Sequence, residues 1–208
     1  MNLSNKLTVL RMVLIPFVLA FMFQMPGYWG VFAQLWNRFQ TRYGMIIALI
    51  FFIAASLTDF LDGHLARKNA WVTDFGKFLD PIADKLLVLS VLIAFAGLGR
   101  LSTLIAILTL GRDFMVTGVR LMAAHQGVVI AASMGGKVKT TVQLLGLIFC
   151  FIHAILLQML QFYPISTIVL RGCNVLYVIL IWASVVLALK TCWDYLSKGW
   201  IYIREGAR

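Results

Sequence analysis

The chain has 208 residues, of which 62% are hydrophobic and 12% are charged, and its mean hydropathy is +0.92. These values lie outside the range of soluble globular domains, so most of the surface must face lipid. A formal net charge of +10 would suggest nucleic-acid binding in a soluble protein, but in a membrane protein basic residues mark the cytoplasmic ends of helices. We therefore expect a membrane protein that does not bind nucleic acid.

Six apolar runs follow one another along the chain. A membrane crossing takes about 20 residues, so six helices and short connections use almost the whole length. This predicts one membrane domain over residues 1–208. The predicted fold class is an all-α integral membrane protein with six transmembrane helices, at about 8–25, 44–66, 78–98, 101–122, 138–160 and 166–189.

The basic residues predict the orientation of these helices. If the N-terminus is inside, the outer segments between the runs hold Arg38, Arg42 and Arg100, and many more basic residues lie on the inner side. An excess of Lys and Arg marks the cytoplasmic side, so both termini are expected there. The basic residues assigned to that side are Lys6, Arg67, Lys68, Lys77, Lys137, Lys139, Lys190, Lys198, Arg204 and Arg208.

Carboxylates are concentrated in one short stretch. Five of the eight acidic residues fall within residues 59–84, although a charge at bilayer depth costs roughly 2.5–3.5 kcal/mol even on lenient scales. Asp59 and Asp62 are three apart, and Asp80 and Asp84 are four apart, so each pair shares one face of a helix. A short turn at residues 68–70 would bring all four together in a pocket at the cytoplasmic boundary.

Four converging carboxylates repel one another unless cations neutralise them. Oxygen ligands without thiolate suit hard ions such as Mg²⁺ or Mn²⁺. A pair of such ions can clamp a diphosphate during an in-line displacement, which predicts a diphosphate substrate. Gly63 and Gly76 lack a Cβ and allow a ligand to come close, although helix packing would also explain them. A purely structural ion-pair network is disfavoured by the cost of burying charge.

The pattern Asp59-x-x-Asp62-Gly63-x-x-Ala66-Arg67, eight residues, then Gly76-x-x-x-Asp80-x-x-x-Asp84 resembles the complete signature of the CDP-alcohol phosphotransferase family. The resemblance implies a polar cavity open to the cytoplasm, two divalent metal ions and a homodimer. It also implies metal binding by Asp59, Asp62 and Asp80, with Asp80 and Asp84 serving the second ion and Asp84 acting as the base. The implied nucleotide site contains Asp59, Asp62, Gly63, Ala66, Arg67 and Gly76.

A second group of charges lies on the fourth and fifth apolar runs. Arg112 and Arg120 are eight apart and close to one helical face, and Lys137 and Lys139 begin the next run on the same side. Four cations so placed predict a pocket for the phosphate of an acceptor alcohol. The alternative is contact with lipid head groups, or a pair between Arg112 and Asp113.

The stretches GRDFMVTGVR, GGKVKTTVQ and SNKLTVLRMVLIPF resemble bacterial members of this family whose acceptor is sn-glycerol 3-phosphate. Within the last of them, Asn5, Thr8 and Arg11 match an opening motif and are expected at the entrance to the site. The implied reaction takes CDP-diacylglycerol and sn-glycerol 3-phosphate to phosphatidylglycerophosphate and CMP at a bacterial cell membrane. Inositol phosphate, serine and inositol remain alternative acceptors. An ion channel or transporter is less consistent with the sequence, because the Asp residues gather at one membrane face.

Overall fold

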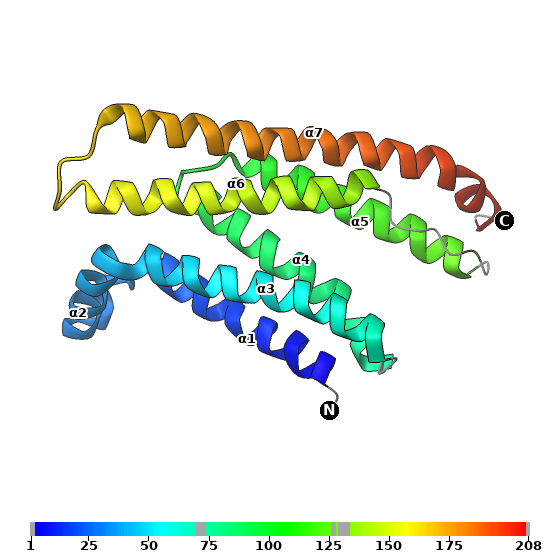
Figure 1. Cartoon of the computed structure of the whole chain (residues 1–208), viewed down its shortest axis with the longest axis horizontal. Helices are drawn as coiled ribbons and strands as arrows, with labels where there is room; N and C mark the ends of the chain where they lie inside the picture. The colour runs from blue at the N-terminus through cyan, green and yellow to red at the C-terminus, as the bar shows by residue number, and fades with distance from the viewer. Residues whose placement is uncertain (1–2, 70–73, 126–127, 129–133, 207–208) are drawn as a thin grey trace.

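The computed structural model describes residues 3–69, 74–125, 128 and 134–206, and the side chains of 8–58, 82–83, 85–124, 128 and 134–197. Over these ranges the chain is helical and has no strand (Figure 1). Six long helices confirm the predicted fold class. They are α1 (Leu3–Met22), α3 (Met45–Asn69), α4 (Asp74–Gly97), α5 (Thr103–His125), α6 (Met134–Met159) and α7 (Thr167–Gly206).

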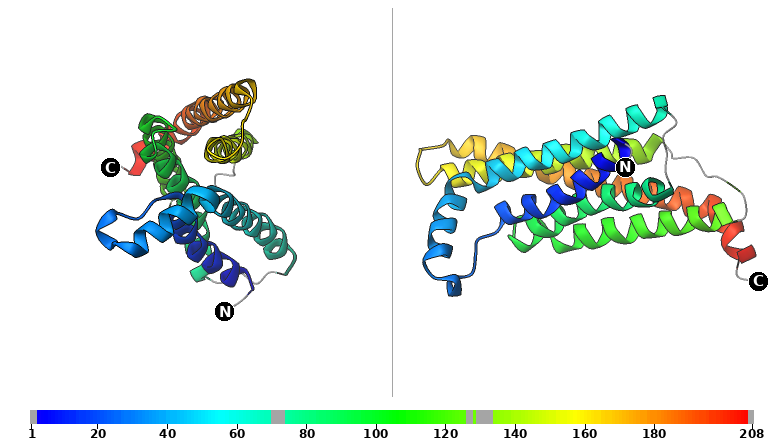
Figure 2. Two further views of the ribbon diagram at one scale, coloured as in Figure 1. Left: turned by 90° about the vertical axis from the view of Figure 1, so that its left-hand side faces the viewer. Right: turned by 90° about the horizontal axis from the view of Figure 1, so that it is seen from below.

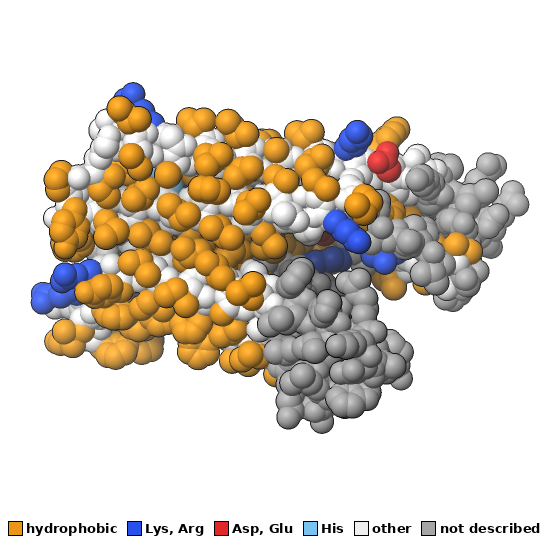
Figure 3. Space-filling view, in the orientation of Figure 1, with side chains coloured by type: hydrophobic (Ala, Val, Ile, Leu, Met, Phe, Trp, Pro, Cys, Tyr) orange, Lys and Arg blue, Asp and Glu red, His pale blue; other side chains and the backbone are white. Residues whose placement is uncertain are grey.

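The helices have the length and composition of membrane spans. Among the described residues, Val31–Thr58, Met134–Met159 and Thr167–Ser197 are long and apolar enough to cross a membrane, and Thr8–Met22 and Lys85–Gly97 are shorter apolar stretches. Hydrophobic side chains cover the middle of the face shown in Figure 3, while Lys and Arg side chains lie toward its two ends. This distribution is typical of a protein that crosses a bilayer.

The helices form two groups that α4 connects. In the first group α1 packs against α3 and α4, and in the second α7 packs against both α5 and α6; α4 also contacts α5. One end of the bundle holds the start of α1, the end of α3 and the start of α4 (Figures 1 and 2). The end of α5, the start of α6 and the end of α7 lie toward the same end. That end carries the segments predicted to be cytoplasmic.

The centre of the bundle is closely packed. Phe151 of α6 lies against Phe52 of α3 and Phe95 of α4, with ring centroids 5.4 Å and 4.7 Å apart. Gly146 of α6 lies directly against Ile181 of α7, because a Cβ at Gly146 would be 2.8 Å from Ile181 Cδ1. These contacts hold α3, α4, α6 and α7 at fixed distances from one another.

The helix α2 (Val31–Phe39) was not predicted from the sequence. It lies between a 3-10 helix, η1 (Gly27–Trp29), and a π-helix, η2 (Gln40–Gly44). It crosses the end of the bundle opposite the predicted cytoplasmic end (Figure 2). Ala33 is buried against the protein, whereas Val31, Phe32, Leu35 and Arg38 are exposed. The helix is only nine residues long, too short to give a membrane-spanning signal.

Candidate active site

The four predicted metal ligands lie on two neighbouring helices. Asp59 and Asp62 are in the last part of α3, and Asp80 and Asp84 are in the first half of α4. Both helices run further toward their junction than predicted, since α3 continues to Asn69 and α4 begins at Asp74. Residues 68 and 69 of the predicted turn are therefore helical, and residue 70 lies outside the described residues. The side chains of all four aspartates lie outside the described residues.

Two of these aspartates, Asp59 and Asp84, are one helical turn away from residues of the hydrophobic core. Ala55 of α3 and Leu87 of α4 are buried in the same hydrophobic cluster. Asp59 is four residues after Ala55, and Asp84 is three residues before Leu87. Because residues three or four apart share a helical face, the position of Asp59 falls on the face of α3 that carries Ala55, and the position of Asp84 falls on the face of α4 that carries Leu87.

The buried stripe of α1 continues toward its N-terminus. Ile15 belongs to the core cluster, and Arg11 and Thr8 lie four and seven residues before it. The side chains of Thr8 and Arg11 are 0% and 1% exposed. Both therefore lie inside the bundle on the face of α1 that packs against α3 and α4. Asn5 is also on α1, with its side chain outside the described residues, and the entrance role of all three stays a prediction.

The donor set fits a divalent metal site. The four aspartates would supply only oxygen ligands, from two helices that contact each other, and oxygen ligands are what Mg²⁺ and Mn²⁺ prefer. Among the side chains that are described, no three His, Cys, Asp or Glu come together. The metal prediction therefore depends on these four aspartates. The predicted nucleotide-site residues share their helices, and their side chains also lie outside the described residues: Gly63, Ala66, Arg67 and Gly76.

Two of the four predicted phosphate-binding cations meet at a carboxylate. Arg112 Nη1 donates a hydrogen bond to Asp113 Oδ1 at 2.7 Å, and Lys139 Nζ lies 3.3 Å from the same oxygen. Lys139 Nζ is also 3.4 Å from Asp113 Oδ2. The pair between Arg112 and Asp113, which the sequence left open as an alternative, is thus present, and it occurs together with the approach of Lys139 from α6.

The guanidinium of Arg112 is also held by α7. Its Nε donates to the carbonyl oxygen of Ala188 at 3.3 Å, and its Nη2 donates to Thr191 Oγ1 at 2.8 Å. Thr191 in turn donates to Ala188 O at 2.9 Å. All three nitrogens of Arg112 therefore have a protein partner. Thr191 was missed from the sequence because the last helix was predicted to end at residue 189, before this threonine.

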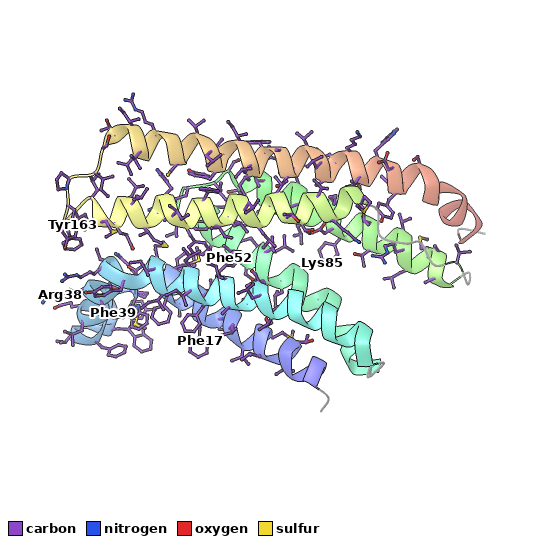
Figure 4. All side chains as sticks on the ribbon, in the orientation of Figure 1. Phe17, Arg38, Phe39, Phe52, Lys85 and Tyr163 are labelled. Carbon is purple, nitrogen blue, oxygen red and sulfur yellow. The ribbon has the colours of Figure 1, made fainter. Side chains whose placement is uncertain are left out.

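A threonine joins this cluster to α4. Thr117 lies one turn after Asp113 on α5, and its hydroxyl donates to the backbone carbonyl of Asp113 at 2.7 Å. The same hydroxyl accepts a hydrogen bond from Lys85 Nζ. Lys85 directly follows Asp84 in the sequence, and Figure 4 shows it in the interior of the bundle, away from the end that carries Arg38 and Phe39. The cation cluster is therefore next to the helix that carries the predicted base.

The other two predicted phosphate-binding residues, Arg120 and Lys137, lie on the surface. Arg120 and Lys137 are both exposed, whereas Lys139 is 2% exposed. The structure brings Arg112 and Lys139 together at Asp113 and places Arg120 and Lys137 outside that contact. The four-cation pocket stays a prediction.

Comparison with known proteins identifies a family. The family model described as CDP-alcohol phosphatidyltransferase matches residues 1–190. A protein of Bacillus subtilis named CDP-diacylglycerol–glycerol-3-phosphate 3-phosphatidyltransferase is 36% identical over 199 residues, which cover 96% of this chain and 95% of the relative. A protein of the same name from Rickettsia bellii is 32% identical over 93% of both chains. A probable phosphatidylglycerophosphate synthase of Mycobacterium tuberculosis is 41% identical over 68% of this chain and 62% of its own.

Proposed function

The chain belongs to the CDP-alcohol phosphatidyltransferase family, and we propose that it transfers the phosphatidyl group of CDP-diacylglycerol to sn-glycerol 3-phosphate. The products are phosphatidylglycerophosphate and CMP. The observation that carries this proposal is the similarity to relatives named for this reaction over nearly the whole of both chains. The convergence of Arg112 and Lys139, cations from two different helices, supports an acceptor that carries a phosphate.

The reaction is an in-line displacement at one phosphorus. A hydroxyl oxygen of the acceptor forms a bond to the phosphorus that carries diacylglycerol. The bond from this phosphorus to the bridging oxygen of the diphosphate breaks, and CMP leaves with the electron pair of that bond. Asp84 takes the proton of the attacking hydroxyl. Arg112 and Lys139 bind the phosphate of the acceptor and thereby orient its hydroxyl for attack.

Divalent metal ions belong to this proposal. Asp59, Asp62, Asp80 and Asp84 would hold two Mg²⁺ or Mn²⁺ ions, which supply positive charge for the diphosphate and the leaving CMP. Gly63, Ala66, Arg67 and Gly76 lie on the same two helices and would line the nucleotide site next to them. The Arg67 guanidinium is suited to a phosphate or a nucleotide oxygen.

We place this site at the cytoplasmic face of a cell membrane that the chain crosses several times. The excess of Lys and Arg in the segments at that end of the bundle supports this orientation. CDP-diacylglycerol is a membrane lipid, so a site at the boundary admits its acyl chains from the bilayer and its nucleotide from water. Assembly as a homodimer, which the family signature implies, is part of the same proposal.

Release of CMP by purified protein tests the proposed function. Detergent-purified protein would receive CDP-diacylglycerol and Mg²⁺, with glycerol 3-phosphate, inositol phosphate, serine and inositol offered separately as acceptors. We expect CMP release with glycerol 3-phosphate and not with the other three. Release with another acceptor alone would keep the reaction class and overturn the assigned acceptor. An ion channel or transporter would release no CMP with any of them.

A further inference from the structure

We propose that Asp113 is a positioning residue of the acceptor site. Its carboxylate holds Arg112 of α5 and Lys139 of α6 at the separation at which they receive the acceptor phosphate. This inference rests on the proposed function, because it assumes that these two cations bind that phosphate. It assigns a role to a carboxylate that takes no part in the chemical step.

The two cations share a single oxygen. Asp113 Oδ1 is 2.7 Å from Arg112 Nη1 and 3.3 Å from Lys139 Nζ. Because both cations approach this oxygen, their positive charges lie close enough to repel each other, and the carboxylate between them offsets the repulsion. Asp113 therefore sets the distance between a cation of α5 and a cation of α6. Neither helix would fix that distance alone, because both cations sit on long, flexible side chains.

Burial makes the carboxylate necessary. The side chains of Arg112, Asp113 and Lys139 are 11%, 12% and 3% exposed. A buried charge that loses its partner is strongly destabilising, whereas a buried pair that keeps its partners is tolerated. With Asp113 in place the three groups carry a net charge of +1, which is enough to attract an anion without leaving two uncompensated cations inside the bundle.

The residues around the carboxylate are tied to the surrounding helices. The backbone carbonyl of Asp113 accepts a hydrogen bond from Thr117 at 2.7 Å, and Thr117 accepts one from Lys85 of α4. Arg112 is anchored to α7 through Ala188 and Thr191. A cluster tied to four helices is preorganised, so little ordering is left for the moment when the acceptor binds.

Enough donors remain for a phosphate. Arginine has five N–H groups, and Arg112 uses three of them in these bonds to protein. Lysine has three, and the approach of Lys139 to the two oxygens of Asp113 uses at most two. The remaining N–H groups of the two residues are available to an incoming phosphate. The acceptor therefore binds without displacing Asp113.

The direction in which Asp113→Asn changes the KM for the acceptor shows whether Asp113 positions the two cations or only adds negative charge. If Asp113 only adds negative charge near the pocket, the substitution Asp113→Asn would lower the KM for the anionic acceptor. If Asp113 positions the two cations, the same substitution would raise this KM, because Arg112 and Lys139 would move apart. We expect a rise of about tenfold or more, the size that corresponds to losing one charge-assisted hydrogen bond.

The experiment measures kcat and the KM of each substrate in full-length protein in detergent. Asp194→Asn is the matched control, since it removes the same charge from an exposed position on α7. We expect Asp113→Asn to raise the KM for glycerol 3-phosphate while the KM for CDP-diacylglycerol stays within about twofold, and Asp194→Asn to change neither. A fall in the KM for glycerol 3-phosphate, no change, or an equal rise in both KM values would overturn the inference.

A second variant decides the question if Asp113→Asn does not fold. Asp113→Glu keeps the charge and the ion pairs but lengthens the side chain by one methylene, which shifts both cations. Positioning predicts a several-fold higher KM for glycerol 3-phosphate at unchanged thermal stability, and an unchanged KM would refute it. The wild-type protein separates the two proposals: if it releases no CMP with glycerol 3-phosphate, both fall, whereas an active wild type with insensitive variants refutes only the role of Asp113.

Discussion

Substituting Lys139 with methionine tests which of two neighbouring lysines binds the acceptor. Lys137 and Lys139 are two residues apart on α6, so they lie on different faces of the helix, and the sequence alone does not say which face meets α5. The structure separates them, since Lys139 is 2% exposed with Nζ 3.3 Å from Asp113, while Lys137 is exposed. Methionine has a similar length and volume and removes only the charge and its donors. We therefore expect Lys139→Met and Lys137→Met to differ sharply.

The size of the difference follows from burial. A hydrogen bond from a charged group is worth about 1.5–3 kcal/mol, and each 1.4 kcal/mol is about a factor of ten. Lys139→Met should therefore raise the KM for glycerol 3-phosphate roughly ten- to hundredfold. An exposed charge contributes at most about 1 kcal/mol, so Lys137→Met should change this KM by no more than about fivefold.

The assay is CMP release at varied glycerol 3-phosphate and saturating CDP-diacylglycerol, with thermal unfolding of each variant measured in parallel. Asp113 has a second partner besides Lys139, because its Oδ1 lies 2.7 Å from Arg112 Nη1. When Lys139 is replaced, the buried carboxylate keeps this partner. The loss of stability should therefore be smaller than the roughly 3–5 kcal/mol expected when a buried charge loses every partner. Equal effects of the two substitutions, or an unchanged KM in Lys139→Met, would refute the assignment of Lys139 to the acceptor pocket.

Other predictions concern the metal site and the packing of the bundle. Asp80→Asn should lower CMP release by at least about a thousandfold because it removes a metal ligand, and Asp194→Asn, at an exposed position, should leave it unchanged. Treatment with EDTA should stop CMP release, and added Mg²⁺ or Mn²⁺ should restore it; activity that survives complete chelation would contradict the metal proposal. Gly146→Val should lower the free energy of unfolding by about 1–3 kcal/mol, because even a Cβ there would lie 2.8 Å from Ile181 Cδ1. Gly172→Val, at a position with nothing within 4 Å, is the matched control in the same thermal unfolding measurement.

The long helices could be predicted because their signal is local. A run of about 20 apolar residues is a property of the sequence alone, and each predicted run corresponds to one long helix. Helix α2 was missed because nine residues are too few to give a membrane-spanning signal. The extension of α7 beyond residue 189 was missed because polar residues there weaken the apolar pattern, although the helix continues to Gly206.

In the candidate site, too, the sequence predicted what depends on local spacing and not what depends on contacts between helices. The spacing of Asp59 and Asp62 and of Asp80 and Asp84 indicates a shared helical face, and the helices found at these positions agree with that spacing. The spacing of Lys137 and Lys139 gave no reason to prefer one lysine. Burial of Lys139 against a carboxylate of α5 supplies that reason.

The sequence by itself determined that the chain lies in a membrane, where its six long helices are and which family it belongs to. These properties depend on composition, on runs of neighbouring residues and on spacings within one or two helices. The signature in residues 59–84 falls in this class, since all its members lie on one helical hairpin. Only the tertiary structure decided that Asp113 joins Arg112 to Lys139 and that Arg112 reaches Ala188 and Thr191 on α7. Partners up to 79 positions apart meet through the packing of α5, α6 and α7. No local pattern records which faces of three helices come together, because that choice depends on how all their side chains pack at once.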